Sequence, residues 1–195
     1  MSEIGDYYNN LISMYGHNPK SCDYGRETTQ KLKFEILSSF RDHSNQSILD
    51  IGCGFADYYS FLNDRFEDIK YYGVDLSELM IEKAKELHPE LNLELKNVFD
   101  EKINEKYDIV TANGIFYLLG ENAKETMFDY IRKMYKMANK AVIFNSLSSF
   151  TENKDQNEFY ADPTEIFTFC SKLSNRLAIR HDYHPRDFSI YIQKV

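Results

Sequence analysis

Apolar and polar positions follow two different periods along this chain. In the first 47 residues the apolar positions recur every three or four residues, which predicts amphipathic helices over residues 3–14 and 27–40. After residue 47, short apolar runs alternate with further helical patterns. The apolar runs predict strands over residues 48–51, 70–74, 91–96, 107–111, 141–145, 177–182 and 188–193. The helical patterns between them start near residues 56, 77, 122 and 162.

This alternation predicts an α/β fold, with a Rossmann-like, seven-stranded, mostly parallel sheet and helices on both faces. The last two strands are separated by too few residues for a crossover, so we expect the last strand to be antiparallel. We expect a single domain over residues 1–195, with residues 1–47 as a helical lid and residues 48–195 as the core. Residues 148–160 are polar and aperiodic, and we expect them to form a mobile loop.

A glycine turn follows the first strand of the core. Asp50 lies in that strand, and Gly52-Cys53-Gly54 separates it from the next helical pattern. Because glycine has no Cβ, it adopts backbone conformations closed to other residues and lets a ligand contact the main chain. Open α/β sheets bind ligands at the carboxyl ends of their strands, so this turn predicts a binding site.

The charges around the turn indicate the class of ligand. A dinucleotide site has the pattern G-x-G-x-x-G, but Asp57 stands here at the third glycine position. The carboxylates of Asp50 and Asp57 would repel a pyrophosphate, which favours a ligand that carries positive charge. On this stretch alone, a Gly-rich connection that binds nothing remains an alternative.

The segment Asp50-Ile51-Gly52-Cys53-Gly54 resembles the first motif, D-x-G-C-G, of the class I S-adenosylmethionine-dependent methyltransferases. The cofactor of that family carries an ammonium and a sulfonium, and its only anion is one carboxylate. Asp75 ends the next predicted strand, where an acid of the family accepts hydrogen bonds from the ribose hydroxyls. The resemblance implies a cofactor site made by Asp50, Gly52, Cys53, Gly54, Asp75, Leu76, Asn97, Val98, Phe99, Asn113 and Gly114.

The adenine contact stays open between two residues. The family often has an aspartate just after the third strand, where this chain has Asn97 followed by Val98, and Asp100 is the rival. Phe99 either covers the ring or packs in the core. The motifs that carry the resemblance extend from residue 48 to about residue 145, and beyond that point the resemblance is one of topology.

The resemblance implies an enzyme that transfers a methyl group in line to an oxygen or nitrogen of a small molecule. The sequence contains no metal-binding cluster, so we expect transfer without a metal, and the acidic charge favours a metabolite or a sugar as acceptor. A protonated acceptor needs a base, for which a neutral histidine oriented by an aspartate is suited. The catalytic candidates are His181, Asp182 and Tyr117, and His184 and Asp187 flank the same turn. In the lid, the candidates for substrate contact are Tyr15, His17, Tyr24 and Arg26.

The composition of the chain argues against several classes of binding partner. The formal net charge of −8 argues against a nucleic-acid partner, which requires a basic surface. The chain contains no run of 18 apolar residues and no secretion signal at its start, so we expect no membrane partner and a cytoplasmic location. Three widely spaced cysteines suggest neither a disulfide framework nor a zinc site. We expect a monomer or a homodimer.

Two other functions stay open. The first is an NAD(P)-dependent oxidoreductase on a similar sheet, against which the missing third glycine and Asp57 argue. The second is a non-catalytic S-adenosylmethionine-binding scaffold subunit, which a large exposed apolar patch and the lack of a pocket beside the methyl group would indicate.

Overall fold

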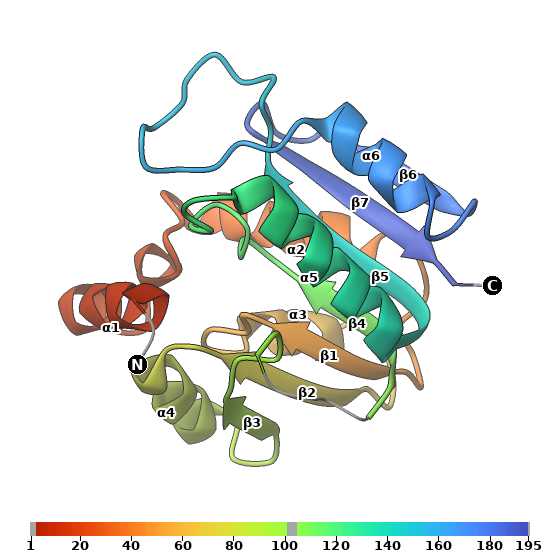
Figure 1. Cartoon of the computed structure of the whole chain (residues 1–195). Helices are drawn as coiled ribbons and strands as arrows, with labels where there is room; N and C mark the ends of the chain where they lie inside the picture. Colours follow the sequence, from red (N-terminus) through yellow and green to blue (C-terminus); the bar gives the residue numbers. More distant parts are fainter. Residues whose placement is uncertain (1–2, 101–104, 195) are drawn as a thin grey trace. The chain divides into compact units, whose positions relative to one another are not determined.

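The computed structural model describes residues 3–100 and 105–194, and Figure 1 labels its helices and strands. It consists of two compact units, Met1–Lys102 and Ile103–Val195. The helices are α1 (Glu3–Tyr15), α2 (Glu27–Ser38), α3 (Asp57–Asn63), α4 (Glu78–Leu87), α5 (Ala123–Met137) and α6 (Pro163–Ser171), with a short 3₁₀ helix η1 (Pro19–Cys22). The strands are β1 (Ser47–Ile51), β2 (Lys70–Asp75), β3 (Asn92–Leu95), β4 (Tyr107–Ala112), β5 (Ala138–Leu147), β6 (Leu177–Arg180) and β7 (Asp187–Gln193).

The first unit contains three parallel strands. β1 pairs with β2, and β2 pairs with β3 on its other side. Ile48 and Leu49 of β1 are fully buried, as expected for a strand covered on both faces. Gly73 lies where the strands are packed most closely, because a Cβ there would come within 2.7 Å of Leu93 Cδ2 and 2.9 Å of Cys53 Sγ. The packing around β2 therefore requires glycine at this position.

The second unit contains the remaining four strands. β4 pairs in parallel with β5, β5 pairs in antiparallel with β7, and β7 pairs in antiparallel with β6. α5 packs against β4 and β5, and α6 packs against β6 and β7. The strand order β3-β2-β1-β4-β5-β7-β6, with β7 antiparallel to its neighbours, confirms the predicted Rossmann-like fold class.

Local sequence signals account for several helix ends. Ser77 Oγ accepts a hydrogen bond from the Met80 amide at 3.1 Å and caps α4, as the sequence predicts. Asp162 caps α6 in the same way, and Pro163 occupies its first turn. No helix within residues 3–100 and 105–194 is long and apolar enough to cross a membrane.

Strand β5 is longer than the predicted strand over residues 141–145. Its polar residues Asn145 and Ser146 suggested a strand end, but both are buried and paired with β7, opposite Ser189 and Phe188. The following stretch, residues 148–160, has no helix and no regular strand, in agreement with the predicted loop. An isolated bridge joins Ser148 to Ala161 and closes the base of this loop.

Candidate active site

The turn after β1 has an unusual backbone. Gly52 and Gly54 have φ values of +74° and +54°, in the left-handed region that glycine adopts without strain. The amides of Gly52 and Cys53 both donate to the Val74 carbonyl, at 2.8 and 3.1 Å. The glycine turn is thereby held against the carboxyl end of β2.

Asp75, at the end of β2, holds the same turn through hydrogen bonds. Its Oδ2 accepts a hydrogen bond from the Gly54 amide at 2.8 Å, and its Oδ1 accepts one from the Ser77 amide at 2.9 Å. Burial raises the pKa of Asp75, and the hydrogen bonds from these backbone amides oppose that rise. A carboxylate oxygen accepts more than one hydrogen bond, so both oxygens keep capacity for the two hydroxyls of a ribose.

Asp50 is the buried acid of the site. Asp50 is only 2% exposed. Its Oδ2 accepts a hydrogen bond from the Tyr71 hydroxyl at 2.5 Å. Within the described residues, Oδ1 has no hydrogen-bond partner. Burial raises the pKa of Asp50 to about 7, the bond from Tyr71 lowers it, and the charge of Asp75 raises it further. An unpaired buried carboxylate oxygen is costly, so this atom is suited to receive a cationic donor.

Asp57 has a different environment from the one its sequence position suggested. Its Oδ1 lies 3.0 Å from His17 Nε2, and its Oδ2 accepts a hydrogen bond from Gln30 Nε2 at 3.2 Å. The His17 ring also packs edge-on against Phe55, with 4.7 Å between the ring centroids. Asp57 therefore joins the N-terminal segment to the glycine turn, and its charge is already engaged by these partners.

A second contact joins α1 to the end of β2. Asn9 Oδ1 accepts hydrogen bonds from Ser77 Oγ at 2.7 Å and from the Leu79 amide at 3.3 Å. Within the first unit, the N-terminal segment thus touches the loops that follow β1 and β2. Sequence reasoning missed Asn9, Gln30 and Tyr71, because nothing in their local sequence marks a partner that lies far along the chain.

The other lid candidates are more exposed to solvent than the residues of the glycine turn. Tyr15 is 43% exposed, Tyr24 is half-buried and Arg26 is exposed at the N-cap position of α2. Cys22 lies close to the glycine turn, because a Cβ added to Gly54 would lie 3.3 Å from its Sγ. The 3₁₀ helix η1 thus leaves no spare room beside Gly54.

After β3, the two rivals for the adenine contact bind each other. Asn97 Nδ2 donates to Asp100 Oδ2 at 2.7 Å, and Asn97 Oδ1 accepts from the Phe99 amide at 3.1 Å. Val98 and Phe99 are buried, and Leu76 after β2 is half-buried. Asn97 and Asp100 therefore form one polar pair, whereas the sequence presented them as alternatives.

In the second unit, the loop after β4 is fixed by an asparagine of β5. Asn145 Oδ1 accepts a hydrogen bond from the Gly114 amide at 2.7 Å, and its Nδ2 donates to Asn113 Oδ1 at 2.6 Å. Asn145 is buried, and Gly114 has a φ of +74° with open space on its Cβ side. Sequence reasoning missed Asn145, which it took for the end of a strand.

His181 and Asp182, two of the catalytic candidates, bind other groups. His181 Nε2 lies 2.6 Å from Ser148 Oγ, whereas Asp182 is exposed and accepts two hydrogen bonds from Arg180, at 2.6 and 3.0 Å. Tyr117 is half-buried, and its carbonyl accepts a hydrogen bond from the Phe159 amide at 2.8 Å.

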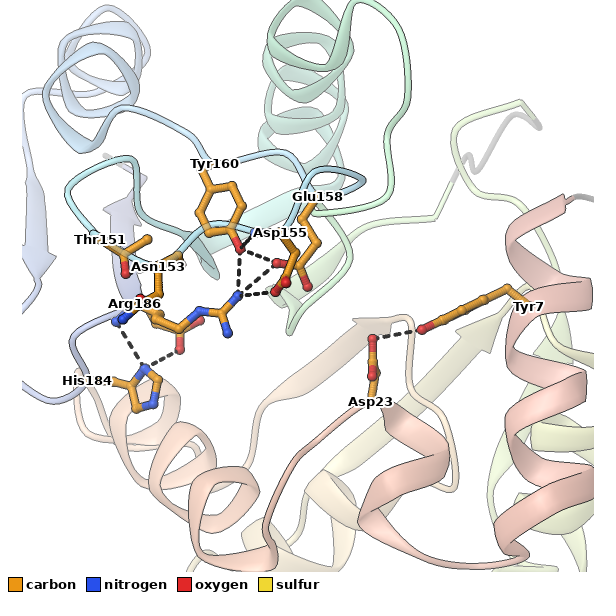
Figure 2. A network of polar contacts seen from close by, with 10 residues as sticks. Tyr7, Asp23, Thr151, Asn153, Asp155, Glu158, Tyr160, His184 and Arg186 are labelled. Carbon is orange, nitrogen blue, oxygen red and sulfur yellow. Dashed lines mark hydrogen bonds and ion pairs between the residues drawn. The ribbon is translucent and has the colours of Figure 1, made fainter.

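The turn between β6 and β7 contains a different histidine–aspartate pair. His184 Nδ1 lies 2.7 Å from Asp187 Oδ2, and the Asp187 side chain is almost fully buried. Beside it, Arg186 Nη2 contacts Glu158, Asp155 and the Tyr160 hydroxyl of the loop after β5, at 2.8, 3.2 and 2.6 Å (Figure 2). The same figure shows a separate contact of the N-terminal segment, from the Tyr7 hydroxyl to Asp23 at 3.0 Å.

The described part of the chain contains neither a group of residues placed to bind a metal ion nor an activated cysteine. No group of three or more histidine, cysteine, aspartate or glutamate side chains within these residues is placed to hold a metal ion. Cys22, Cys53 and Cys170 are free thiols. Burial raises the pKa of each of these thiols well above its usual value, so none is an activated thiolate.

Comparisons with known proteins agree on one family. A family model described as a methyltransferase domain matches residues 49–141. A "putative methyltransferase" of Mycobacterium tuberculosis is 28% identical over 155 residues, which are 76% of this chain and 93% of that protein. A carboxy-S-adenosyl-L-methionine synthase of Campylobacter jejuni is 30% identical over 173 residues, which are 84% of this chain and 67% of that protein.

A solved structure shares the fold over nearly the whole chain. The magnesium protoporphyrin IX methyltransferase of Synechocystis, solved with bound S-adenosylhomocysteine, superposes with a TM-score of 0.73 at 15% identity and covers 98% of each chain. The chain belongs to the class I S-adenosylmethionine-dependent methyltransferase family.

Proposed function

We propose that this protein binds S-adenosylmethionine at the carboxyl ends of β1 and β2 and transfers its methyl group to an oxygen or nitrogen of a small molecule. The observation that carries the proposal is the carboxylate of Asp75, which accepts hydrogen bonds from amides on both sides, Gly54 and Ser77. This contact sets an acid directly beside the glycine turn, at the edge of the sheet where open α/β folds bind ligands.

Four groups of the first unit hold the cofactor in this proposal. Asp75 accepts the ribose hydroxyls, and the turn from Gly52 to Gly54 lies beside the cofactor. Asp50 Oδ1, which is buried and unpaired within the described residues, receives the ammonium group. The polar pair of Asn97 and Asp100 offers both a donor and an acceptor to the adenine edge.

The same charges disfavour a dinucleotide. His17 and Gln30 already engage Asp57, so the argument against a pyrophosphate depends on Asp50 and Asp75. A pyrophosphate beside the carboxylates of Asp50 and Asp75 would be repelled, whereas an ammonium is attracted. This reasoning supports S-adenosylmethionine over a nicotinamide cofactor.

When bound, the cofactor supplies a methyl group on a positively charged sulfur, which is a good leaving group. The protein then has to orient the acceptor and exclude water. Asn145 contributes by fixing the loop at Asn113 and Gly114, where the backbone beside Gly114 is open. Asn113, Gly114 and Tyr117 are the residues that we assign to the surroundings of the methyl group.

We further propose that residues 1–195 act as one methyltransferase domain in which residues 1–47 form the lid. The contacts of His17 with Asp57 and of Asn9 with Ser77 support the lid role within the first unit. A formal net charge of −8 supports a metabolite or sugar as acceptor over nucleic acid. The non-catalytic scaffold remains the alternative that a turnover assay decides.

A second candidate function follows from the similarity to a carboxy-S-adenosyl-L-methionine synthase. The Campylobacter relative matches 84% of this chain and is named as a synthase of carboxy-S-adenosyl-L-methionine. An enzyme of that kind would release a nucleoside heavier than S-adenosylmethionine by a carboxyl group. A methyltransferase releases S-adenosylhomocysteine, which is lighter by one methylene.

The test is to incubate the protein with S-adenosylmethionine carrying a deuterated methyl group and a small-molecule extract, followed by mass spectrometry. The proposal expects S-adenosylhomocysteine together with one extract compound that gains the labelled methyl group. A heavier nucleoside would establish the synthase function. Binding without any nucleoside product would establish the scaffold.

A further inference from the structure

The loop after β5 begins and ends at one place on the second unit. Ser148 and Ala161 form an isolated bridge, and the amides of Ser149 and Ala161 donate to the carbonyls of Ala161 and Leu147, each at 2.9 Å. Residues 149–160, here called the strap, are therefore a closed surface loop whose two ends lie side by side. Compact loops of this kind are frequently functional.

The outer part of the strap has little apolar packing. Every residue from Glu152 to Asn157 is exposed, and the three residues that follow are half-buried. Phe150, the first aromatic residue of the strap, is 61% exposed. Burial of apolar side chains therefore contributes little to the position of the outer part, which depends on polar contacts.

Arg186, in the turn between β6 and β7, makes polar contacts with three residues of the strap (Figure 2). Its Nη2 donates to Glu158 Oε2 at 2.8 Å, to Asp155 Oδ2 at 3.2 Å and to the Tyr160 hydroxyl at 2.6 Å. The Arg186 carbonyl accepts a hydrogen bond from the Ser148 amide at 2.8 Å. The arginine is thus fixed at the base of the strap and holds the outer part through its guanidinium.

Two other cations near the strap do not have this role. Lys154 lies in the strap itself, with its Nζ 5.9 Å from the ring centroid of Tyr160, so it moves together with the loop. Arg180 donates two hydrogen bonds to Asp182, at 2.6 and 3.0 Å. Arg186 is the cation that joins the strap to the turn before β7.

The strap also contacts the loop after β4. The Phe159 amide donates to the Tyr117 carbonyl at 2.8 Å, and Tyr117 follows Asn113 and Gly114 in that loop. β4 and β5 are parallel, so the loops after them lie at the edge of the sheet where their carboxyl ends meet. In open α/β sheets this is the edge that binds ligands.

The contacts of Arg186 can break while the sheet stays intact. The side chains of Arg186 and Glu158 are 35% and 20% exposed, and partly solvated ion pairs contribute little free energy. The base of the strap is held separately, by backbone hydrogen bonds next to β5. Opening of the outer part is therefore a local event that does not require unfolding of the second unit.

We propose that the strap is a lid of the second unit, that Arg186 is its clasp, and that closure holds the methyl acceptor against the loop after β4. This inference rests on the proposed function. With the clasp formed, the acceptor is retained and water is excluded. With the clasp broken, acceptor and product exchange with solvent. Arg186 is a positioning residue, because it acts through the strap and not on a reacting atom.

The first experiment measures hydrogen–deuterium exchange of the whole protein by mass spectrometry of its peptides. Arg186→Gln is expected to speed exchange in residues 150–160 by about tenfold or more, because charge-assisted hydrogen bonds are lost, and to leave β5 unchanged. Glu158→Gln removes the charge from the strap side and is expected to act in the same direction. Arg186→Lys keeps a cation with three donors and is expected to retain part of the protection.

Arg176→Gln is the matched control, because Arg176 is an exposed arginine of the same unit that precedes β6. This variant is expected to exchange like the wild type throughout residues 150–160. Wild-type exchange of the strap in both Arg186→Gln and Glu158→Gln would overturn the clasp.

The second experiment measures turnover with S-adenosylmethionine and a small-molecule extract at a series of dilutions. In Arg186→Gln, the extract concentration that gives half the maximal rate is expected to rise about tenfold, because the acceptor is no longer retained. The maximal rate and the Kd for S-adenosylhomocysteine are expected to stay within about twofold, and Arg186→Lys is expected to lie between the wild type and Arg186→Gln.

The two proposals fail in different ways. Failure of the wild-type protein to bind S-adenosylhomocysteine would refute the proposed function itself. Normal binding and turnover, with an unchanged half-saturating extract concentration in Arg186→Gln, would refute only the role of the strap.

Discussion

The hydroxyl of Tyr71 donates a hydrogen bond of 2.5 Å to Asp50 Oδ2, and the other oxygen of this buried carboxylate has no partner in the described residues. The two residues lie on paired strands, β1 and β2, directly beside the glycine turn. Asp50 is therefore oriented by Tyr71, and its unpaired oxygen is available to a cation in the candidate cofactor site.

Asp50 makes the stability of the ligand-free protein depend on pH. Its pKa is raised from the usual 3.8 to about 7, so the folded state binds its proton more tightly than the unfolded chain does. The stabilisation is complete below the unfolded pKa and is lost as pH rises toward 7. We expect the free energy of unfolding to fall between about pH 4 and pH 7, and urea titrations of Asp50→Asn to show a smaller fall.

Cofactor binding is expected to depend on pH in the opposite direction. The ammonium of the cofactor favours ionised Asp50, so the Kd for S-adenosylhomocysteine should become tighter as pH rises through about 7. Calorimetric titrations at pH 6 and pH 8 measure this change. Asp50→Asn is expected to bind more weakly at pH 8 and to remove most of the difference. An equally steep dependence in that variant would assign the titration to another group.

Tyr71→Phe tests the orienting hydrogen bond. Removing the hydroxyl leaves both oxygens of Asp50 without a donor and disfavours its ionised form, so cofactor affinity at neutral pH should drop about tenfold. The control is Tyr72→Phe, since neighbouring strand residues point to opposite faces of the sheet and Tyr72 is equally buried. Equal losses in the two variants would contradict a specific role for Tyr71.

The contacts of the N-terminal segment are expected to slow cofactor release. His17→Ala and Asn9→Ala each remove a contact with a loop after β1 or β2, so the dissociation rate of S-adenosylhomocysteine should rise in stopped-flow measurements. Asn10→Ala, on the exposed side of the same helix, is the control. A double-mutant cycle between His17 and Asp57 is expected to give about 0.2–1 kcal/mol, because both side chains are partly exposed.

Gly73→Ala is expected to destabilise the protein by about 1–3 kcal/mol. A Cβ would lie 2.7 Å from Leu93 Cδ2 and 2.9 Å from Cys53 Sγ, so neighbouring atoms must move. Gly25→Ala is the matched substitution, since no atom lies within 4 Å of its added Cβ. Urea denaturation should separate the two, and similar losses of stability would show that the close packing around β2 is not decisive.

Much of the fold was predictable because its signals are local. The spacing of apolar residues, together with glycine and proline positions, indicated the helices and strands. Ser77 and Asp162 indicated two helix starts, because their side chains cap the first turn. The extension of β5 could not be predicted from the spacing of apolar residues, because Asn145 and Ser146 are polar residues buried in a strand. Their burial depends on pairing with β7, which no local pattern encodes.

The candidate site was predictable in part for the same reason. The glycine turn and the acids at the strand ends carry local signals, whereas the partners of Asp57 lie 40 and 27 residues away in the sequence. The sequence offered His181 and Asp182 as catalytic candidates without indicating their partners. In the structure they bind other groups, and the histidine–aspartate pair in contact at this turn is His184 with Asp187. His184 and Asp187 lie three positions apart, and the turn between β6 and β7 brings them together.

Calorimetric titration of the wild-type protein and of Asp75→Asn with S-adenosylhomocysteine and with NADH tests the central claim most directly. Asp129→Asn, at an exposed acid on α5, serves as the control. The account predicts that wild type and control bind S-adenosylhomocysteine but not NADH, and that Asp75→Asn binds it about 10- to 100-fold more weakly. Binding of NADH at similar affinity, or an unchanged Kd for S-adenosylhomocysteine in Asp75→Asn, would contradict it.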